Sequence, residues 1–199
     1  AFVDFEDDKR YNKWGIHPVD IRSKFSKEKR ALNGARLGII ESEKFQRLTK
    51  VNFLLKHIQF KTIEEFFKFF SEGQKFFDSI ILDVEHKHLS ALKNQNLFGK
   101  NIIYFNVSEG KNDLRNKNCL KNFFHTYASN LMLTDAVSQY LIEKKWNKVL
   151  LLTGPLDEDL EMSNSFKLSA KKFGLKITDE KFFVDNNDPR IRDKNDLSF

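Results

Sequence analysis

Strand-length apolar runs alternate with helix-length segments along almost the whole chain, and this alternation limits the possible folds more than any single motif does. Seven runs have the length and character of strands, and they cover residues 1–5, 51–58, 79–84, 101–107, 123–127, 148–154 and 176–184. The run SIILDV at 79–84 is apolar almost throughout, which is typical of a strand buried on both faces of a parallel sheet.

Segments with helical periodicity separate most of these runs. They cover residues 31–48, 62–73, 86–97, 129–146 and 157–174. Thr62 and Glu65 make a capping-box pattern at the start of one segment, and Gly174 stands where a glycine commonly ends a helix. The repeated strand–helix–strand order predicts βαβ units, that is, an α/β fold with a parallel sheet flanked by helices.

Two of these helices have apolar residues gathered on one side, at the spacing of a helical face. In the segment 129–146 we expect the apolar face to be buried, and its members are Leu133, Ala136, Val137, Tyr140 and Leu141. In the segment 31–48 the residues on one side are Leu37, Ile40, Phe45 and Leu48.

The length of 199 residues suits one ordinary domain or two smaller lobes. Only two strand-like runs follow residue 147, and two strands are too few to close a core. The sequence therefore predicts a first α/β lobe at 1–127 and the opening βα units of a second lobe at 128–199. We expect Ser129 to cap the first helix of that second lobe, whose remaining strands come from a longer polypeptide or from elsewhere.

The net charge of +6 and the isoelectric point near 9.2 are compatible with nucleic-acid binding, but the charge pattern argues against it. The basic residues are mostly lysines scattered among nearly as many acids, without an arginine-rich stripe. No run approaches the ~20 apolar residues of a membrane span. The first residue is Ala rather than Met, which we interpret as a mature product whose leader has been removed. The single Cys119 excludes an internal disulfide and a cysteine zinc site.

The sequence lacks the common catalytic motifs. It contains no GxSxG, GxGxxG, Walker A or HExxH pattern and no recognisable Cys–His pairing. His86 and His88 would point in divergent directions on a helix, so we expect no metal site there. The chain is therefore expected to be neither an enzyme nor the holder of a cofactor, although fold alone leaves an enzyme of the same architecture open.

An alternative interpretation is a receiver-like or flavodoxin-like signalling domain. Glu6, Asp7 and Asp8 follow the first strand-like run, as the Mg²⁺-binding carboxylates of receiver domains do, and Asp83 nearly occupies the position of the isolated aspartate. A lysine should then follow VLLLTG, and none does. The sequence therefore favours an acidic surface loop as the explanation of the three carboxylates.

Small polar residues stand where several strands are expected to end. Asn106 and Ser108 follow one strand, His125 and Thr126 end the next, and Gly154 lies in a Thr-Gly-Pro turn after a third. Ligands of open α/β sheets bind outside the carboxyl ends of the strands. We therefore expect these residues to contact a ligand, although each one alone also suits an ordinary turn.

The order of these landmarks resembles the type I periplasmic-binding-protein family of ABC-transporter receptors. The matching segments are NGARLGIIES (33–42), the NVSEG turn, the FHT strand end, the Ser-capped helix that follows it, and NKVLLLTGPLDED, which would open the second lobe. The resemblance implies a periplasmic, non-enzymatic receptor that captures a small molecule in a cleft between two lobes. It also implies delivery of that molecule to a membrane permease.

Within that family the resemblance is greatest to substrate-binding proteins associated with pyrroloquinoline quinone (PQQ)-dependent alcohol catabolism, through FEDDKRY, YFNVSEGKNDLRNKNC and FFHTYASNLMLTDAVSQYL. It implies PQQ or a related compound as the ligand. PQQ is a flat tricarboxylate, which cations and aromatic faces suit. We expect Arg10, Tyr11 and Trp14, with Lys9, to bind it from the long loop at 6–30, and Arg115 to add a cation.

Two positions depart from the amino-acid receptors of this family. Those receptors have a Gly-Pro-Ser type turn after the third strand, where this chain reads LDVEHKH. Glu158 stands about where their second-lobe aromatic residue packs on the ligand, and we include it among the expected ligand-binding residues. An ordinary amino-acid ligand is therefore not what this sequence predicts.

Overall fold

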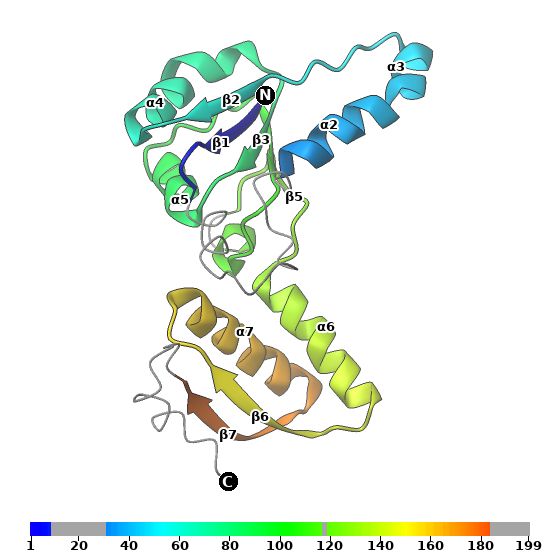
Figure 1. The fold of residues 1–199 in the computed structure, drawn as a ribbon, viewed down its shortest axis with the longest axis vertical. Coiled ribbons are helices and arrows are strands. Elements are labelled where there is room, and N and C mark those ends of the chain that lie inside the picture. Colours follow the sequence, from blue (N-terminus) through cyan, green and yellow to red (C-terminus); the bar gives the residue numbers. More distant parts are fainter. Residues whose placement is uncertain (9–30, 117–118, 184–199) are drawn as a thin grey trace, which may run out of the picture. The chain divides into compact units, whose positions relative to one another are not determined.

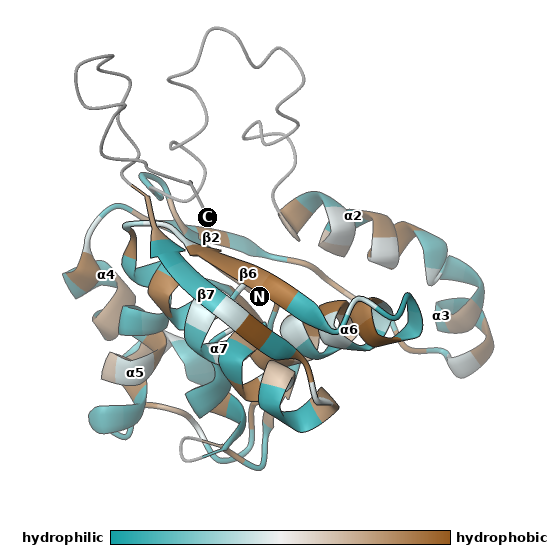
Figure 2. Ribbon diagram, turned by 90° about the horizontal axis from the view of Figure 1, so that it is seen from below, coloured by the Kyte–Doolittle hydropathy of each residue, from teal (hydrophilic) through white to brown (hydrophobic). Residues whose placement is uncertain are grey.

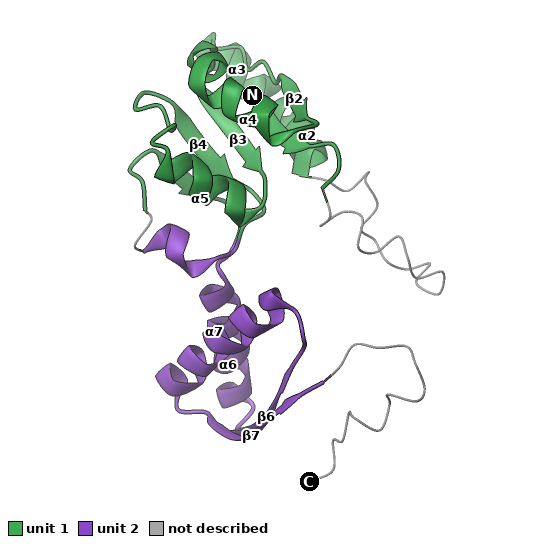
Figure 3. Cartoon of the chain, turned by 90° about the vertical axis from the view of Figure 1, so that its left-hand side faces the viewer, with its two compact units in different colours: residues 1–109, 117–127 green, residues 110–116, 128–199 purple. Residues whose placement is uncertain are grey.

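The structure is a computed structural model that describes residues 1–8, 31–116 and 119–183 (Figure 1). The chain divides into two compact units (Figure 3). Unit 1 comprises Ala1–Glu109 and Lys117–Tyr127, and unit 2 comprises Gly110–Asn116 and Ala128–Phe199. The sequence assigned 110–116 to the first lobe, whereas these residues pack within unit 2.

Unit 1 is built on a five-stranded sheet with the strand order β2-β1-β3-β4-β5, and all neighbouring strands are parallel. The strands are β1 (Phe2–Phe5), β2 (His57–Phe60), β3 (Ser79–Asp83), β4 (Ile103–Asn106) and β5 (Phe123–His125). The predicted α/β fold with a parallel sheet is thus confirmed. In β3, Ile80 and Leu82 lie on one face of the sheet and are fully buried, whereas Ile81 between them is partly exposed.

Helices flank this sheet on both sides, with α4 and α5 on one side and α2 on the other (Figure 1). The helices of unit 1 are α2 (Ala31–Glu41), α3 (Glu43–Thr49), α4 (Ile63–Lys68) and α5 (His86–Asn94). A π-helical turn at Phe69–Gly73 and a 3-10 turn at Gln74–Phe76 extend α4. The Thr62 hydroxyl accepts a hydrogen bond from Glu65 N at 3.3 Å, as the capping pattern predicts.

The core of unit 1 is largely aromatic. Phe66 and Phe70 are fully buried with ring centroids 4.9 Å apart, and Phe98 meets the ring of Tyr104 at 4.8 Å. The Tyr104 hydroxyl accepts a hydrogen bond from Gly99 N at 2.7 Å and donates one to the Gln74 side chain. Burial raises the pKa of Tyr104 to about 12. Within the aromatic core, the Tyr104 hydroxyl therefore has hydrogen-bond partners both as an acceptor and as a donor.

One strand of unit 1 begins later than the sequence predicts. The expected strand at 51–58 is β2 at His57–Phe60, and Leu54 within the expected range is 91% exposed. The register with β1 pairs Phe2 with His57, so the ladder starts at the residue where β1 starts. An apolar run alone does not locate this starting point, because pairing with β1 decides which residues are extended.

The expected helix at 31–48 is two helices that meet at Ser42. The Ser42 hydroxyl donates to Ile39 O at 2.8 Å, and α3 begins at the next residue. Side chains of serine that bond to nearby backbone compete with helical continuity. The apolar residues that the sequence places on one side are more than half exposed, although Phe53 stacks on Phe45 with ring centroids 6.3 Å apart; they are Leu37, Ile40, Phe45 and Leu48.

Unit 2 contains α6 (Asn130–Glu143), β6 (Lys148–Thr153), α7 (Asp157–Phe173) and β7 (Lys176–Phe182), with a 3-10 turn at Asn112–Arg115. β6 and β7 form a two-stranded parallel sheet. The Ser129 hydroxyl accepts from Met132 N at 3.1 Å, so Ser129 is the N-cap that the sequence predicts. Gly174 ends α7 with a φ of 77°, a left-handed conformation that favours glycine.

The buried face of α6 is not the predicted one. Leu133, Val137 and Tyr140 are 41%, 50% and 53% exposed, and Ala136 and Leu141 are not buried either. Thr134 and Ser138 are buried instead, because small side chains let α6 approach α7 closely. Figure 2 colours each residue by hydropathy and shows the apolar stretch that runs along β6. Within the described ranges, no helix is both long and apolar enough to cross a membrane.

Candidate functional site

A cavity of about 180 Å³ lies at the carboxyl ends of β1 and β3 in unit 1. In this sheet β2 pairs with one edge of β1 and β3 pairs with the other edge, so the order of the strands reverses at β1. Such a switch point is where open α/β sheets bind ligands. The lining residues are Phe5, Asp7, Asp8, Ile63, Glu85, Lys87 and His88. None of them is among the solute-binding residues expected from sequence, although Asp7 and Asp8 belong to the acidic run that the receiver-like alternative would use.

The walls of this cavity are acidic and aromatic. The ring of His88 stacks on Phe5 with centroids 4.5 Å apart, and Lys87 Nζ lies 2.7 Å from Glu85 Oε2. Asp8 is only 3% exposed, so it is not part of the acidic surface loop favoured for Glu6–Asp8 from sequence. Carboxylates beside aromatic faces suit a ligand with a cationic or hydrogen-bond-donating group.

Asn106 organises the neighbouring end of β4. Its side chain is fully buried, and Oδ1 accepts hydrogen bonds from Glu109 N at 2.9 Å and Ser108 N at 3.3 Å. Its Nδ2 donates to Glu109 O at 2.6 Å and to His125 Nδ1 at 3.0 Å. The amide thus makes all four of the hydrogen bonds available to it. Asn106 therefore holds this edge together and does not offer its amide to a ligand.

His125 and Thr126 lie beside Asn106 at the end of β5. Asn106 and His125 are register partners across β4 and β5. Thr126 N donates to Asn106 O at 3.0 Å, and the Thr126 hydroxyl donates to the same oxygen at 3.3 Å. Four predicted site residues, which are Asn106, Ser108, His125 and Thr126, therefore meet at one edge of one sheet.

Glu109 belongs to this edge and was not predicted. Its Oε2 accepts a hydrogen bond at 2.9 Å from His86 N, the first residue of α5. A carboxylate at a helix N-terminus interacts favourably with the unpaired backbone N–H groups and the helix dipole. Asn106 is a turn-forming residue three positions before Glu109, and this spacing is the sequence signal that could have identified Glu109.

The two histidines of α5 have different surroundings. His86 Nε2 lies 3.1 Å from the Ser90 hydroxyl one turn further along, whereas His88 stacks on Phe5. Their rings diverge as expected for positions two residues apart on a helix. In the part of the chain that the structure describes, no group of three or more His, Cys, Asp or Glu side chains is arranged to hold a metal ion.

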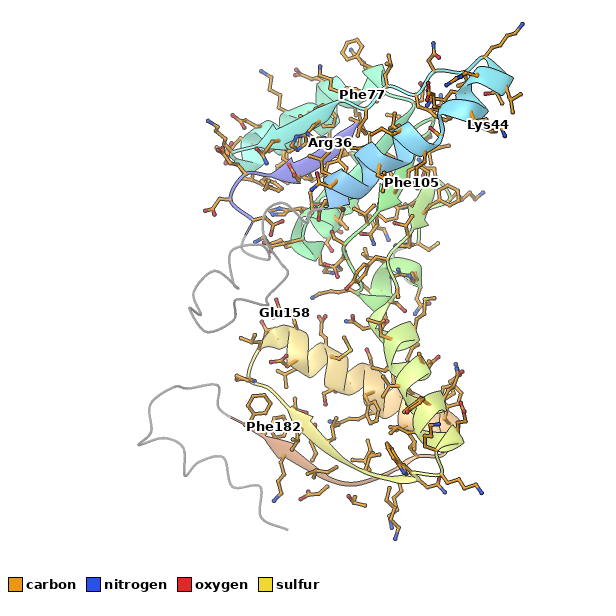
Figure 4. All side chains as sticks on the ribbon, turned by 45° about the vertical axis from the view of Figure 1, so that its right-hand side comes forward. Arg36, Lys44, Phe77, Phe105, Glu158 and Phe182 are labelled. Atoms are coloured by element: carbon orange, nitrogen blue, oxygen red, sulfur yellow. The ribbon has the colours of Figure 1, made fainter. Side chains whose placement is uncertain are left out.

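The remaining predicted residues that the structure describes are in unit 2. Gly154 is buried after β6, and a Cβ there would lie 2.3 Å from Asp159 Oδ2. That carboxylate accepts from Leu156 N at 3.1 Å and so caps the start of α7. A side chain at position 154 would therefore displace the Asp159 carboxylate from this position. Glu158 is exposed on the first turn of α7 (Figure 4).

A second cavity, of about 430 Å³, lies within unit 2 between α6, β6 and α7. Its lining is mainly apolar and comprises Leu133, Thr134, Val137, Leu151, Leu152, Gly154, Asp159, Met162, Ser163, Phe166 and Phe183. Ser163 of this lining accepts a hydrogen bond from the Thr153 hydroxyl at 3.0 Å, and both residues contact Glu180. The Lys167 ammonium bonded to Glu180 lowers the pKa of that carboxyl group.

Of the other residues expected to bind the ligand, the structure describes Arg115 alone. Arg10, Tyr11 and Trp14, with Lys9, lie outside the described residues. Arg115 lies in unit 2 at the end of the 3-10 turn, next to Lys111 and Asn112, which bind α7 through Glu161 and Ser165.

Comparison with solved structures identifies the fold. One ABC transporter substrate-binding protein from Desulfitobacterium hafniense aligns with 98% of this chain at a TM-score of 0.61 and 13% identity. A second protein of that description from the same organism, in complex with Leu, covers 81% at 0.54 and 14% identity. A periplasmic binding protein from Burkholderia mallei covers 76% at 0.50 and 14% identity. The chain therefore has the fold of periplasmic substrate-binding proteins.

The chain spans about half the length of these structures, namely 54%, 49% and 43% of the three chains in the order given. No protein-family model matches the sequence, and a search of curated proteins finds no significant match. At 13–14% identity the likeness identifies the fold, and the function has to be argued from the site.

Proposed function

We propose that this chain is part of the solute-binding component of an ABC transporter. The observation that carries the proposal is the alignment of 98% of the chain with a substrate-binding protein at a TM-score of 0.61. Polar residues of unit 1 also gather at the edge of the sheet where α/β proteins bind ligands. The same observations favour a receptor over a receiver-like or flavodoxin-like signalling domain.

In this proposal unit 1 contacts a small molecule through its carboxyl edge. His125, Thr126 and Ser108 supply hydrogen-bonding groups, and the acidic cavity beside Phe5 and His88 lies on the same edge. Gly154 and Glu158 are the proposed contribution of unit 2. The chain binds its solute without chemical turnover, resides in the periplasm, and passes the solute to the membrane permease of the transporter.

The test is a calorimetric titration of the whole chain with a panel of small molecules that includes leucine and PQQ. We expect saturable binding of at least one compound, weakened about tenfold by His125→Ala, which removes one hydrogen bond at the edge. Lys176→Ala, an exposed change at the start of β7, is the matched control and should leave binding unchanged. Mass spectrometry should recover the solute unmodified; a converted product would contradict a receptor role.

PQQ is the specific ligand that we propose from the sequence resemblance. The described edge of unit 1 has one lysine, Lys87, and four carboxylates, which are those of Asp7, Asp8, Glu85 and Glu109. The negative charge of these carboxylates would repel a tricarboxylate. The cations for PQQ would therefore have to come from Lys9 and Arg10. Tryptophan fluorescence during titration with the quinone tests this, and binding no tighter than millimolar would eliminate PQQ as the ligand.

A further inference from the structure

Helices α2 and α3 extend away from the sheet of unit 1 and share one exposed apolar side (Figure 1). The large side chains on it are between 53% and 76% exposed, and they are Leu37, Ile40, Phe45 and Leu48. Backbone hydrogen bonds from Ser42 N to Gly38 O and from Gln46 N to Ser42 O continue the helical course through the bend. The four side chains therefore stay on one side across both helices.

This side is held in shape by Gln46. Its Nε2 donates to Ile39 O at 3.1 Å and to the Ser42 hydroxyl at 2.9 Å, and its Oε1 accepts from Phe53 N at 2.8 Å. The ring of Phe53 lies nearly parallel to that of Phe45, at an interplanar angle of 11°. The surface is therefore organised before any partner arrives, which lowers the entropic cost of binding one.

The residues on this side form a pattern that is symmetric about the bend. A point midway between Ser42 and Glu43 is equally far along the chain from the two members of each of three pairs, which are Leu37 and Leu48, Ile40 and Phe45, and Glu41 and Lys44. If a second copy packs antiparallel about a twofold axis through that point, each residue faces the other member of its pair. Apolar side chains then meet apolar ones, and carboxylates meet ammonium groups.

The exposed area suits a small dimer interface. With about 200 Å² for a whole large side chain, the four apolar residues and Phe53 together expose roughly 600 Å². Glu41 and Lys44 are exposed beside them, and Lys44 is labelled in Figure 4. Two such surfaces would bury roughly 1,200 Å², which is the lower end of the range for specific protein interfaces. The area therefore predicts a dissociation constant in the micromolar range.

We propose that the apolar side of α2 and α3 is the interface of a homodimer, in which a second copy of this chain packs antiparallel about a twofold axis near Ser42 and Glu43. The symmetric pattern favours a second copy over a different protein, because a twofold interface has to match itself. None of its residues lines either cavity, so the dimer is independent of the proposed solute-binding function.

Sedimentation velocity of the whole chain tests the oligomeric state. At about 100 µM we expect a species of twice the chain mass of 23.5 kDa, and a monomer at this concentration would overturn the proposal. Leu48→Lys, a change at an exposed residue, should weaken the dimer at least about tenfold. Leu168→Lys, at the 59% exposed Leu168 of α7, is the matched control and should leave the dimer unchanged. Equal weakening by both variants would place the interface elsewhere and overturn the proposal.

Two charge reversals test the antiparallel pairing. Glu41→Lys and Lys44→Glu each oppose like charges on both sides of the axis, so each variant alone should dimerise at least about tenfold more weakly. An equimolar mixture restores both opposite-charge pairs and should associate within about threefold of the wild type. Glu143→Lys, the same charge change at an exposed residue at the end of α6, is the control. If the mixture associates no better than the separate variants while circular dichroism shows both folded, the proposed pairing is wrong.

Discussion

Units 1 and 2 are both built from parallel strands and helices, yet they bury different kinds of side chain. In unit 1 the buried residues are mainly large and apolar, among them Phe2, Phe66, Phe70, Leu89 and Leu92. In the described part of unit 2 the buried apolar residues are Leu114, Ala170 and Leu175 alone, beside a set of buried hydroxyl residues: Ser129, Thr134, Ser138, Thr153, Ser163, Ser165 and Ser169.

The difference in burial follows from the number of strands in each unit. Five strands and their helices enclose an apolar layer from both faces, whereas β6 and β7 leave much of the apolar surface of unit 2 exposed. Hydrogen bonds such as the 2.8 Å contact between the Thr134 and Ser169 hydroxyls then connect α6 with α7. Because hydrogen bonds contribute less net stability than apolar burial, we expect unit 2 to unfold before unit 1.

The largest effect should come from truncating matched leucines in the two units. Leu89→Ala in α5, at 1% exposure, should lower the free energy of unfolding of unit 1 by about 2–5 kcal/mol, because it leaves a cavity. Leu133→Ala in α6, at 41% exposure, should lower that of unit 2 by less than about 1 kcal/mol. Urea unfolding of both variants measures the difference, and equal losses would mean that unit 2 buries its apolar face after all.

Tyr104→Phe tests the polar link within the aromatic core. Removing the hydroxyl leaves Gly99 N and the Gln74 side chain without this partner and should cost about 1–3 kcal/mol. Because burial raises the pKa of Tyr104 from 10.0 to about 12, its contribution is present below pH 10 and is lost as the pH rises toward 12. Wild-type stability should therefore fall between pH 10 and 12 more steeply than that of Tyr104→Phe. Parallel alkaline curves would refute this.

Gly154→Ala should destabilise unit 2 by about 1 kcal/mol, the usual cost of losing a helix cap. The added methyl group would displace the Asp159 carboxylate that caps α7. The chain has two tryptophans, Trp14 and Trp146. When Trp14 is replaced by Phe, the fluorescence of Trp146, which follows α6, reports on the unfolding of unit 2 alone. Asp159→Ala in the same background should cost a similar amount and should abolish the further effect of Gly154→Ala. Additive losses would show that the glycine acts in another way.

The smallest effect is expected from Asp135 in the contact between α6 and α7. Hydrogen bonds from Lys172 and Ser169 lower the pKa of this carboxyl group. Its contribution is therefore present above the pKa of the unfolded chain and is lost as the pH falls through the lower, folded value. The melting temperature of unit 2 should decline on acidification in the wild type and decline less in Asp135→Asn. Identical pH profiles would show that the ion pair adds nothing measurable.

Much of the candidate site could be anticipated from residue type and position along the strands. Asn106, Ser108, His125 and Thr126 were placed at one sheet edge because parallel strands end on the same side. The acidic cavity could not be anticipated in the same way, since its walls come from the ends of β1 and β3 and the start of α5. Its existence depends on which strands are neighbours, and periodicity does not encode strand order.

The sequence by itself determined the α/β class, the approximate positions of its strands and helices, and the caps at Ser129 and Gly174, because these follow from local periodicity and backbone preference. Tertiary structure alone decided that β2 begins at His57 and that α6 buries Thr134 and Ser138 in place of its leucines. It also decided that the side-chain amide of Asn106 forms hydrogen bonds with Glu109 and His125. These outcomes depend on which surfaces meet, and a side chain is buried only where another element covers it.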